Sequence, residues 1–430
     1  MSVFESYDIR GVFPKEINEE FSYKLGRLIP KLLKCKNVVV GYDVRVSSKK
    51  LFTFLTKGLL EENVKVTSVN ACTTPMLYFA SFFYKFDAAI MVTASHLNKE
   101  YNGFKICSKD AVALGYDSIG WKLEKNINRS FKTKKTNLKV KNLDLSKDYE
   151  NFILNNFKKT NLKVVVDSAN MMGYLDSKIL AKVCTVKNLF DKPDGKMPNH
   201  EDNPLIEKNL KYIIKEMKEG RYDLGVAFDG DCDRVVFIDE EGSIIRSDLI
   251  AALISKYLPK GKIILDSRSS KIVEGTYLGK TIRSVSGHTN IKTSMRKHQA
   301  LYGSELSGHH FFKEFHYADN ALLAVLYILK IMDKEKKVIS ELVKPFKKYF
   351  VSGELNFDVK DKDEKIMQVK DYFKNYRKIQ QVDGLSLYFD DFWFNLRKSN
   401  TEDLLRLNIE ADSEDKLKEV EKTIIKIINH

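Results

Sequence analysis

Residues 224–238 read LGVAFDGDCDRVVFI, and this stretch is the clearest guide to the architecture of the chain. It opens with the short, continuous apolar run 224–228, which is typical of a strand buried on both faces of a sheet. Three aspartates at alternate positions follow that run directly, and a second apolar run comes after them. The stretch therefore predicts two buried strands joined by an acidic loop.

The same pattern of an apolar run followed by polar residues recurs along the chain. The runs that predict further buried strands are 38–40, 88–92, 164–166 and 263–265. Segments with apolar residues at helical spacing lie between the runs, at 21–33, 51–62 and 210–218. This alternation favours an α/β fold with mixed or parallel sheets, in which ligands bind at the carboxyl ends of the strands.

The length of 430 residues is enough for two to four domains. A polar, lysine-rich stretch at 126–146 and turn-like segments at 239–247 and 346–353 indicate the boundaries. The last part of the chain differs, because its predicted strands lie close together and a helix follows them, which indicates an α+β unit. The predicted domains are 1–140, 141–243, 244–349 and 350–430.

Composition argues against several classes of protein. The five cysteines are scattered and form no C-x-x-C pair, so neither a disulfide framework nor a cysteine zinc site is expected. The net charge of +14 comes largely from lysines spread along the whole chain, which indicates a solvated surface rather than a nucleic-acid-binding patch. Without a signal-like start or an apolar stretch of roughly 18 residues, a cytoplasmic protein with no membrane partner is expected.

The acidic loop offers Asp229, Asp231 and Asp233 as ligands for one hard divalent cation. Their spacing is similar to the first half of an EF-hand calcium loop, but Arg234 stands where that loop needs glycine, and strands are expected on both sides. Magnesium is therefore the predicted metal, and a surface acidic turn is the alternative. Arg234 could contact a phosphate oxygen or merely neutralise the aspartates.

A second group of polar residues follows the predicted strand 88–92, where residues 93–96 read TASH and precede Lys105. A hydroxyl near an imidazole and an ammonium group suits a nucleophile, although most Ser-His pairs are turn or capping residues. A Ser-His-Asp hydrolase would need a G-x-S-x-G elbow, which this segment lacks. A serine that carries a phosphoryl group fits better, because magnesium at the aspartates could bridge the phosphoryl oxygens.

Five motifs, in this order, resemble those of the α-D-phosphohexomutases, the family that includes phosphomannomutase/phosphoglucomutase. The amino-terminal signature, phosphoserine loop, magnesium loop, sugar-recognition loop and phosphate clamp are matched by residues 7–11, 93–105, 229–234, 303–309 and 397–402. The resemblance extends through the whole chain. It implies an α/β fold of three related βαβ-rich domains with mixed sheets, plus a smaller C-terminal α+β domain, around a central cleft.

The resemblance also implies a reaction. Phosphorylated Ser95 would donate its phosphoryl group to a hexose phosphate, of mannose or glucose, and the bisphosphate would turn over in the cleft before returning its other phosphate. The expected cofactors are Mg²⁺, held by Ser95 and the three aspartates, and hexose 1,6-bisphosphate as activator. The alternatives are a phosphoglucosamine mutase and a non-catalytic sugar-phosphate-binding relative, and the chain is expected to be a monomer or a dimer.

The resemblance assigns roles to residues far apart in the sequence. The expected catalytic residues are Ser95, His96, Lys105, Arg10 and His309. The expected substrate-binding residues are Tyr7, Arg268, His288, Glu305, Ser307, Arg397, Ser399, Asn400 and Thr401. Arg234 is expected to contact the phosphoserine or the substrate, and His309 is preferred to His310 because of its place in the sugar loop.

The chain departs from the usual family pattern at a few positions. Leu97 and Asn98 stand where asparagine and proline usually complete the phosphoserine loop, Cys232 replaces a glycine, and Asp403 replaces a proline. Because proline would fix the backbone, its absence is expected to loosen the loop and to affect the rate more than the type of reaction.

Overall fold

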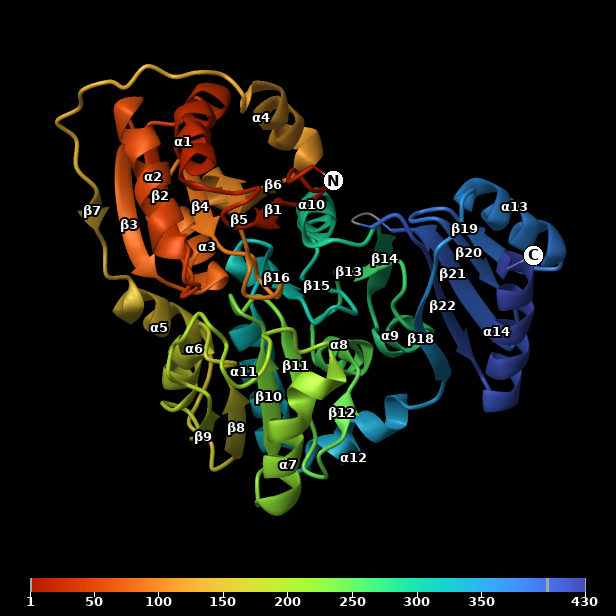
Figure 1. Cartoon of the computed structure of the whole chain (residues 1–430). Coiled ribbons are helices and arrows are strands. Elements are labelled where there is room, and N and C mark those ends of the chain that lie inside the picture. The colour runs from red at the N-terminus through yellow and green to blue at the C-terminus, as the bar shows by residue number, and fades with distance from the viewer. Residues whose placement is uncertain (1, 400–401, 430) are drawn as a thin grey trace.

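The computed structural model describes residues 2–399 and 402–429, which form three sheet-based units and a C-terminal unit around a central cleft (Figure 1). Each of the first three units has a mixed sheet with helices packed against it, and the fourth has an antiparallel sheet. The predicted α/β fold with a smaller α+β unit is therefore confirmed. No helix of these residues is long and apolar enough to cross a membrane.

The first sheet has the strand order β1-β5-β4-β2-β3-β7, with β6 paired to β5. Its strands are β1 (Ile9–Val12), β2 (Asn37–Tyr42), β3 (Lys65–Ala71), β4 (Ala88–Val92), β5 (Tyr101–Ser108), β6 (Val112–Leu114) and β7 (Lys141–Asn142). The helices of this unit are α1 (Glu19–Leu33), α2 (Ser48–Glu61), α3 (Thr74–Phe83) and α4 (Trp121–Asn126). Strands β2, β3 and β4 are parallel, whereas β5 runs antiparallel to β4.

The second and third sheets share one plan, in which three parallel strands continue into an antiparallel edge. The second sheet, ordered β12-β11-β10-β8-β9, contains β8 (Lys163–Asp167), β9 (Thr185–Leu189), β10 (Leu224–Phe228), β11 (Val235–Ile238) and β12 (Ile244–Ile245). The third, ordered β14-β13-β15-β16-β17, contains β13 (Lys262–Asp266), β14 (Lys280–Ser284), β15 (Tyr302–Ser304), β16 (His310–Phe312) and β17 (Ala318–Asp319).

The helices that accompany these two sheets lie before, between and after their strands in the sequence. They are α5 (Ser146–Leu154), α6 (Gly173–Leu180), α7 (Lys211–Glu219), α8 (Ser247–Lys256), α9 (Lys271–Thr276), α10 (His288–His298), α11 (Ala321–Glu335) and α12 (Ile339–Val343). Strands β8, β10 and β13 confirm the predictions at 164–166, 224–228 and 263–265. Helix α7 corresponds to the helix predicted at 210–218.

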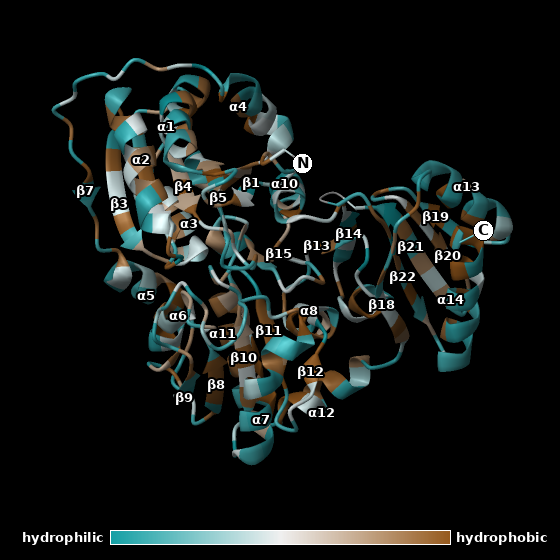
Figure 2. Cartoon of the chain, in the orientation of Figure 1, coloured by the Kyte–Doolittle hydropathy of each residue, from teal (hydrophilic) through white to brown (hydrophobic). Residues whose placement is uncertain are grey.

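The cores explain why the strands read as continuous apolar runs. On β2, Val38 and Val40 pack into one core with residues of α1 and α2, while Val39 faces the opposite side and joins residues of α3. Successive strand residues point to opposite faces, so a sheet covered on both sides buries all of them. Figure 2 shows the hydrophobic strands inside and more polar helices outside.

The C-terminal unit has an antiparallel sheet of order β18-β22-β21-β20-β19. Its elements are β18 (Phe350–Phe357), α13 (Lys362–Tyr372), β19 (Lys378–Gln380), β20 (Leu385–Tyr388), β21 (Phe392–Lys398), β22 (Leu405–Ala411) and α14 (Glu414–Asn429). Its buried apolar side chains form their own cluster, whereas one large core spans the first three units. The predicted domain boundaries stay a prediction; β7, at 141–142, pairs with β3 of the first sheet.

Helices α1 and α2 approach each other closely through two glycines. A Cβ placed on Gly26 would lie 2.2 Å from the carbonyl oxygen of Leu55, and one on Gly58 would lie 2.3 Å from that of Tyr23. Both contacts are with backbone atoms, so the helices would have to separate to admit a methyl group.

Gly26→Ala is therefore expected to destabilise the protein by about 1–3 kcal/mol, because the added methyl group overpacks the contact between α1 and α2. Thermal or urea unfolding followed by circular dichroism would measure the change. Gly275→Ala is the matched control, since nothing lies within 4 Å of a Cβ added in α9. Equal unfolding of the two variants would contradict this account of the helix contact.

Candidate active site

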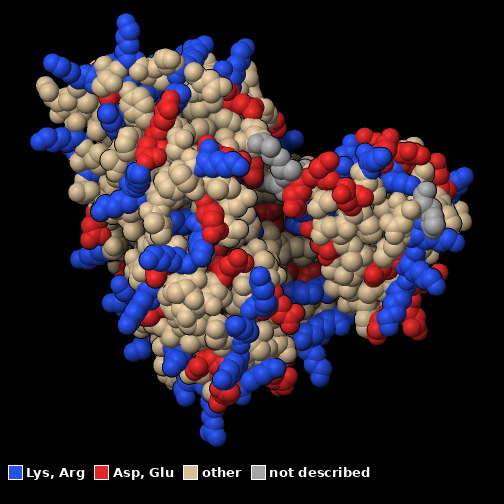
Figure 3. Space-filling view, in the orientation of Figure 1, with Lys and Arg blue, Asp and Glu red and all other residues tan. Residues whose placement is uncertain are grey.

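The loops at the carboxyl ends of the strands line a cleft of about 1020 Å³ to which all four units contribute. Figure 3 shows a hollow between the C-terminal lobe and the rest of the molecule, and on this face basic and acidic side chains are interspersed. The predicted site residues that line the cleft are Tyr7, Arg10, His96, Arg234, Arg268, His288, Glu305, Ser307, His309 and Arg397. Ser95, Lys105 and the three aspartates are buried beside it.

Ser95 lies in the loop that follows β4, and its backbone conformation is unusual. Its φ of 55° is in the left-handed region that residues other than glycine seldom adopt, and its N–H donates to Thr93 Oγ1 at 2.9 Å. Its hydroxyl donates to Asp229 Oδ2 at 2.9 Å and lies 3.2 Å from His96 Nδ1. The fold thus places the predicted nucleophile against an acidic loop that is 134 residues away in the sequence.

The loop between β10 and β11 brings Asp229, Asp231 and Asp233 together, with one oxygen of each within 4.8 Å of the others. All three are buried, and burial and then the charges of Asp233 and Asp231 raise the pKa of Asp229. Asp231 Oδ1 and Asp233 Oδ1 have no hydrogen-bond partner among the described residues. Buried carboxylate oxygens are costly when unpaired, so this donor set fits a hard divalent cation.

Two cations from the first unit lie near these carboxylates. Lys105 Nζ donates to Asp231 Oδ2 at 2.6 Å and also to Asp233 Oδ2. Burial alone would lower the pKa of Lys105, but the two aspartates raise it well above its ordinary value, so the ammonium group is charged. Arg10 Nη2 donates to Asp8 Oδ2 at 2.7 Å, which fixes this guanidinium at the wall of the cleft.

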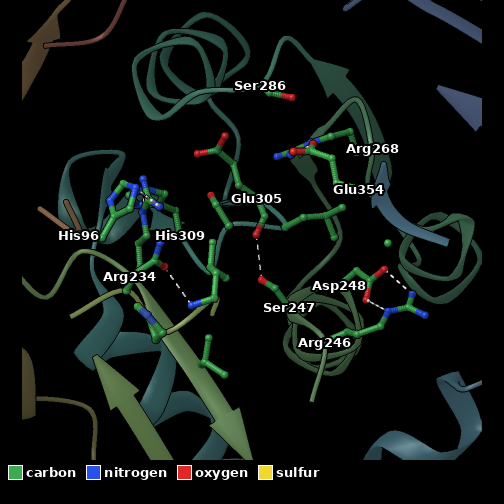
Figure 4. A pocket seen from close by; sticks show the side chains of 18 of the residues that line it. His96, Arg234, Arg246, Ser247, Asp248, Arg268, Ser286, Glu305, His309 and Glu354 are labelled. Carbon is green, nitrogen blue, oxygen red and sulfur yellow. Dashed lines mark hydrogen bonds and ion pairs between the residues drawn. The ribbon is translucent and has the colours of Figure 1, made fainter. Parts of the chain in front are cut away.

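Arg234 lies between two imidazoles in the cleft (Figure 4). Its Nε donates to His309 Nε2 at 2.9 Å, and its Nη1 lies 3.3 Å from His96 Nε2. The same Nε is 3.9 Å from Asp229 Oδ2, which is a long distance for an ion pair. Burial and the charge of Arg234 lower the pKa of His96, so this imidazole is neutral. The guanidinium group therefore contacts at least one neutral imidazole, that of His96, which a phosphate could replace.

A carboxylate orients the His309 imidazole through its Nδ1 atom. Its Nδ1 lies 3.0 Å from Asp319 Oδ2, and Asp319 Oδ1 lies 2.7 Å from Lys292 Nζ. This arrangement directs Nε2 of His309 toward the cleft. The neighbouring His310 is instead part of the interior, where its Nδ1 is 2.6 Å from the hydroxyl of Tyr302, and burial lowers its pKa to about 3.

The predicted sugar-recognition loop is tied to several elements of the third unit. Glu305 Oε1 accepts from Gly287 N at 2.5 Å, and its carbonyl oxygen accepts from Ser247 Oγ at 2.8 Å (Figure 4). Leu306 N donates to Asp266 Oδ2 at 3.0 Å. Burial raises the pKa of Glu305. These contacts hold the Glu305 carboxyl group at the cleft, where it can accept hydrogen bonds from a ligand.

Tyr7 and His288 are in contact at the wall of the cleft. The Tyr7 hydroxyl donates to the Ser286 carbonyl at 2.8 Å, and the two rings pack edge to face with 5.8 Å between their centroids. Gly287 has a φ of 112°, and a Cβ there would lie 2.2 Å from the Tyr7 ring, so this position requires glycine. Ser307 lines the cleft nearby.

The predicted phosphate clamp is described in part. Arg397, on β21, and Arg268, after β13, both donate to Glu354, a residue that the sequence did not assign to the site. Ser399 Oγ accepts from Glu402 N at 3.2 Å. The remaining predicted clamp residues, Asn400 and Thr401, lie outside the described residues.

Two further buried residues that the sequence did not assign to the site, Arg45 and Asp202, hold the predicted phosphoserine loop. Arg45 Nη2 donates to the carbonyl oxygens of Ser95 and Leu97 at 2.8 and 2.6 Å and to Asp202 Oδ2 at 2.9 Å. Its Nη1 donates to the Asn98 carbonyl at 2.7 Å. The sequence offered only a weak indication of this role for Arg45, which is its position just beyond a buried strand. It offered none for Asp202, which lies in an irregular segment.

Comparison with known proteins identifies the same four units. Descriptions of phosphoglucomutase/phosphomannomutase alpha/beta/alpha domains I, II and III match residues 1–136, 144–242 and 246–349, and that of the C-terminal domain matches residues 354–427. A phosphomannomutase of Methanocaldococcus jannaschii is 40% identical over 441 aligned residues, covering 100% of this chain and 98% of the relative. A phosphomannomutase of Escherichia coli K12 is 32% identical, covering 100% of this chain and 99% of the relative.

A solved structure agrees with this assignment. A phosphoglucomutase/phosphomannomutase family protein from Burkholderia thailandensis superposes with a TM-score of 0.90 at 28% identity, over 99% of this chain and 96% of that one. The similarity therefore includes the arrangement of the units as well as their individual folds.

Arg45→Lys is expected to lower the activity of the protein on its substrate roughly a hundredfold, because a single ammonium group cannot bind the four carbonyl and carboxylate oxygens that fix the Ser95 loop. Steady-state rates would measure the loss. Arg377→Lys is the matched control, since Arg377 is a surface residue paired with Asp390. An Arg45→Lys variant that folds and keeps more than half of the wild-type rate would show that the loop does not depend on this anchor.

Proposed function

The chain belongs to the phosphoglucomutase/phosphomannomutase family and is a phosphohexomutase, and from this premise we propose that phosphorylated Ser95 carries the phosphoryl group in its reaction. The observation that supports the proposal most directly is the 2.9 Å hydrogen bond from Ser95 Oγ to Asp229. It joins a hydroxyl of the first unit to the acidic cluster of the second. A phosphoryl group on that hydroxyl would lie beside ligands for a divalent cation and open toward the cleft.

In the first transfer, the bond between phosphorus and Ser95 Oγ breaks, and a bond forms between phosphorus and a free hydroxyl oxygen of a hexose phosphate. The hydroxyl proton passes to His309 Nε2, which lines the cleft and is oriented by Asp319. Ser95 Oγ takes up a proton from solvent as it leaves, relayed by His96, whose Nδ1 lies 3.2 Å away. The second transfer returns the other phosphate of the bisphosphate to Ser95 and restores both protons.

We propose Mg²⁺ as the metal, held by Asp229, Asp231, Asp233 and phosphorylated Ser95. When bound, it would neutralise negative charge on the phosphoryl oxygens during transfer. Lys105 and Arg10 supply fixed positive charge from the first unit, and Arg234 offers donors to a phosphoryl oxygen from the second. Hexose 1,6-bisphosphate would act as an activator by phosphorylating any Ser95 that has lost its phosphate.

Substrate binding is proposed to use both ends of the sugar phosphate. Glu305 and Ser307 provide an acceptor and a donor for neighbouring sugar hydroxyls, while Arg397 and Arg268 bind the phosphate that is not being transferred. Figure 4 shows Glu305 between His309 and Arg268. A hexose phosphate could therefore be bound in two orientations, as interconversion of 1- and 6-phosphates requires. We propose mannose and glucose phosphates as substrates.

Ser95→Ala is expected to lower mutase activity by on the order of 10³-fold or more, because it removes the group that carries the phosphate. The assay compares mannose, glucose and glucosamine 1-phosphates, with magnesium and a trace of the hexose bisphosphate. Ser130→Ala, an exposed serine of the same unit, is the control. Full activity of the Ser95→Ala variant on any of the three sugars would rule out the phosphoserine mechanism.

Addition of magnesium is expected to raise the thermal unfolding temperature of the wild-type protein, with a stabilisation of about 2.7 kcal/mol when the metal is at a hundred times its Kd. Asp231→Asn should abolish most of this shift, because it replaces a charged oxygen ligand. Asp194→Asn, at an exposed position, should leave the shift unchanged. An equal shift in all three proteins would place the metal elsewhere.

A further inference from the structure

Glu354 lies at the centre of three arginines on one side of the cleft. Its Oε2 accepts from Arg268 Nη1 at 2.9 Å and from Arg397 Nη2 at 3.1 Å, and its Oε1 lies 3.2 Å from Arg406 Nη1. Figure 4 shows Arg268 and Glu354 side by side. Arg268 belongs to the third unit, whereas Glu354 and the other two arginines belong to the C-terminal unit. The Glu354 carboxylate therefore joins these two units.

The backbone is shaped to place this carboxylate. Strand β18 pairs with β22, and the register of this pair shifts between Val351 and Glu354. Gly353, within the shift, has a φ of 72°. Such bulges redirect a side chain and are frequent beside active sites. The direction of Glu354 therefore follows from a local irregularity of the strand.

The three arginines retain donors for a further anion. The Nε atoms of Arg268, Arg397 and Arg406 are buried and have no hydrogen-bond partner among the described residues. Burial alone would raise the pKa of Glu354, but the three arginines lower it below its ordinary value, so the side chain is a carboxylate. Asp266, Asp383 and Glu402 also pair with these arginines, and the cluster still has donors that neither they nor Glu354 use.

We propose that Glu354 is a specificity-determining residue. Its carboxylate binds the same guanidinium groups as a substrate phosphate, so the phosphate must displace it. The inference rests on the proposed function, in which these arginines anchor a hexose phosphate. A free phosphate ion must displace the carboxylate without assistance. A hexose phosphate also gains the contacts of its sugar with Glu305 and Ser307, so the competition disfavours inorganic phosphate more than the substrate.

The same residue eases release of the phosphate group. A departing phosphate would break its contacts with these guanidinium groups without replacement, and they would keep only their other partners, which are Asp266 for Arg268, Asp383 for Arg397 and Glu402 for Arg406. Glu354 provides that replacement from within the site. A bisphosphate that must reorient between two transfers therefore leaves behind arginines that are already paired.

Glu354→Gln tests the proposal, because it removes the charge while keeping the length of the side chain and one acceptor oxygen. We expect the variant to bind inorganic phosphate about tenfold more tightly than wild type, as measured by isothermal titration calorimetry in the absence of sugar. Since the measurement needs neither turnover nor phosphorylated Ser95, its result is independent of whether the proposed phosphoserine mechanism holds.

Asp390→Asn is the matched control, because it makes the same change in charge on the same unit at a surface pair with Arg377, where both side chains are about 70% exposed. We expect its phosphate affinity to stay within about twofold of wild type. Glu354→Asp, which keeps the charge, should also stay near wild type. Glu354→Ser, neutral and smaller, replaces the Glu354→Gln variant if the latter does not fold.

Weaker or unchanged phosphate binding by a folded neutral variant at position 354 would overturn the proposal, because Glu354 would then support the arginines rather than compete for them. Equal tightening in the Asp390→Asn variant would also overturn it, since a general change in charge would then explain the effect.

Discussion

The burial of three aspartates beside the Ser95 hydroxyl is the constraint on which the rest of the site depends. Like charges within 4.8 Å of one another are unfavourable in a buried loop unless cations from elsewhere compensate them. Lys105 supplies such a cation from β5 of the first unit, while the aspartates follow β10 of the second. The carboxyl end of β4 in the first sheet therefore lies next to the carboxyl end of β10 in the second. The interface between these two units is part of the site.

The other loops follow from this arrangement. Arg234 immediately follows the aspartates, so its guanidinium group reaches the cleft as soon as the acidic loop is in place, and there it meets His309 from the third unit. Strand β16 begins at His310, directly after His309, and Asp319 on β17 orients the His309 imidazole. The C-terminal unit has a separate core, and its ion pair between Glu354 and Arg268 is one of the contacts that tie it to this centre.

The sequence predicted the elements that local pattern determines. Buried runs such as 88–92 and 224–228 are strands, and the polar residues that follow them, including Ser95 and Asp229, do lie together. It could not predict Arg45, Asp202 or Glu354 as site residues, because their contacts form between segments far apart in the chain. The register shift that directs Glu354 has no signature beyond a glycine in a strand, and Leu97 and Asn98 gave no hint that Arg45 binds their carbonyl groups.

The site compensates its charges internally on both sides of the cleft. Lys105 pairs with the aspartates where a divalent cation is proposed to bind, and Glu354 pairs with the arginines where a phosphate is proposed to bind. Isolated buried charges of either sign would be costly, so such pairing stabilises the protein before any ligand arrives. It also lowers the net gain from each ligand, because every incoming ion shares or replaces an existing partner. For a reaction that must release a phosphate and bind it again within one turnover, moderate binding at both ends favours turnover over tight retention.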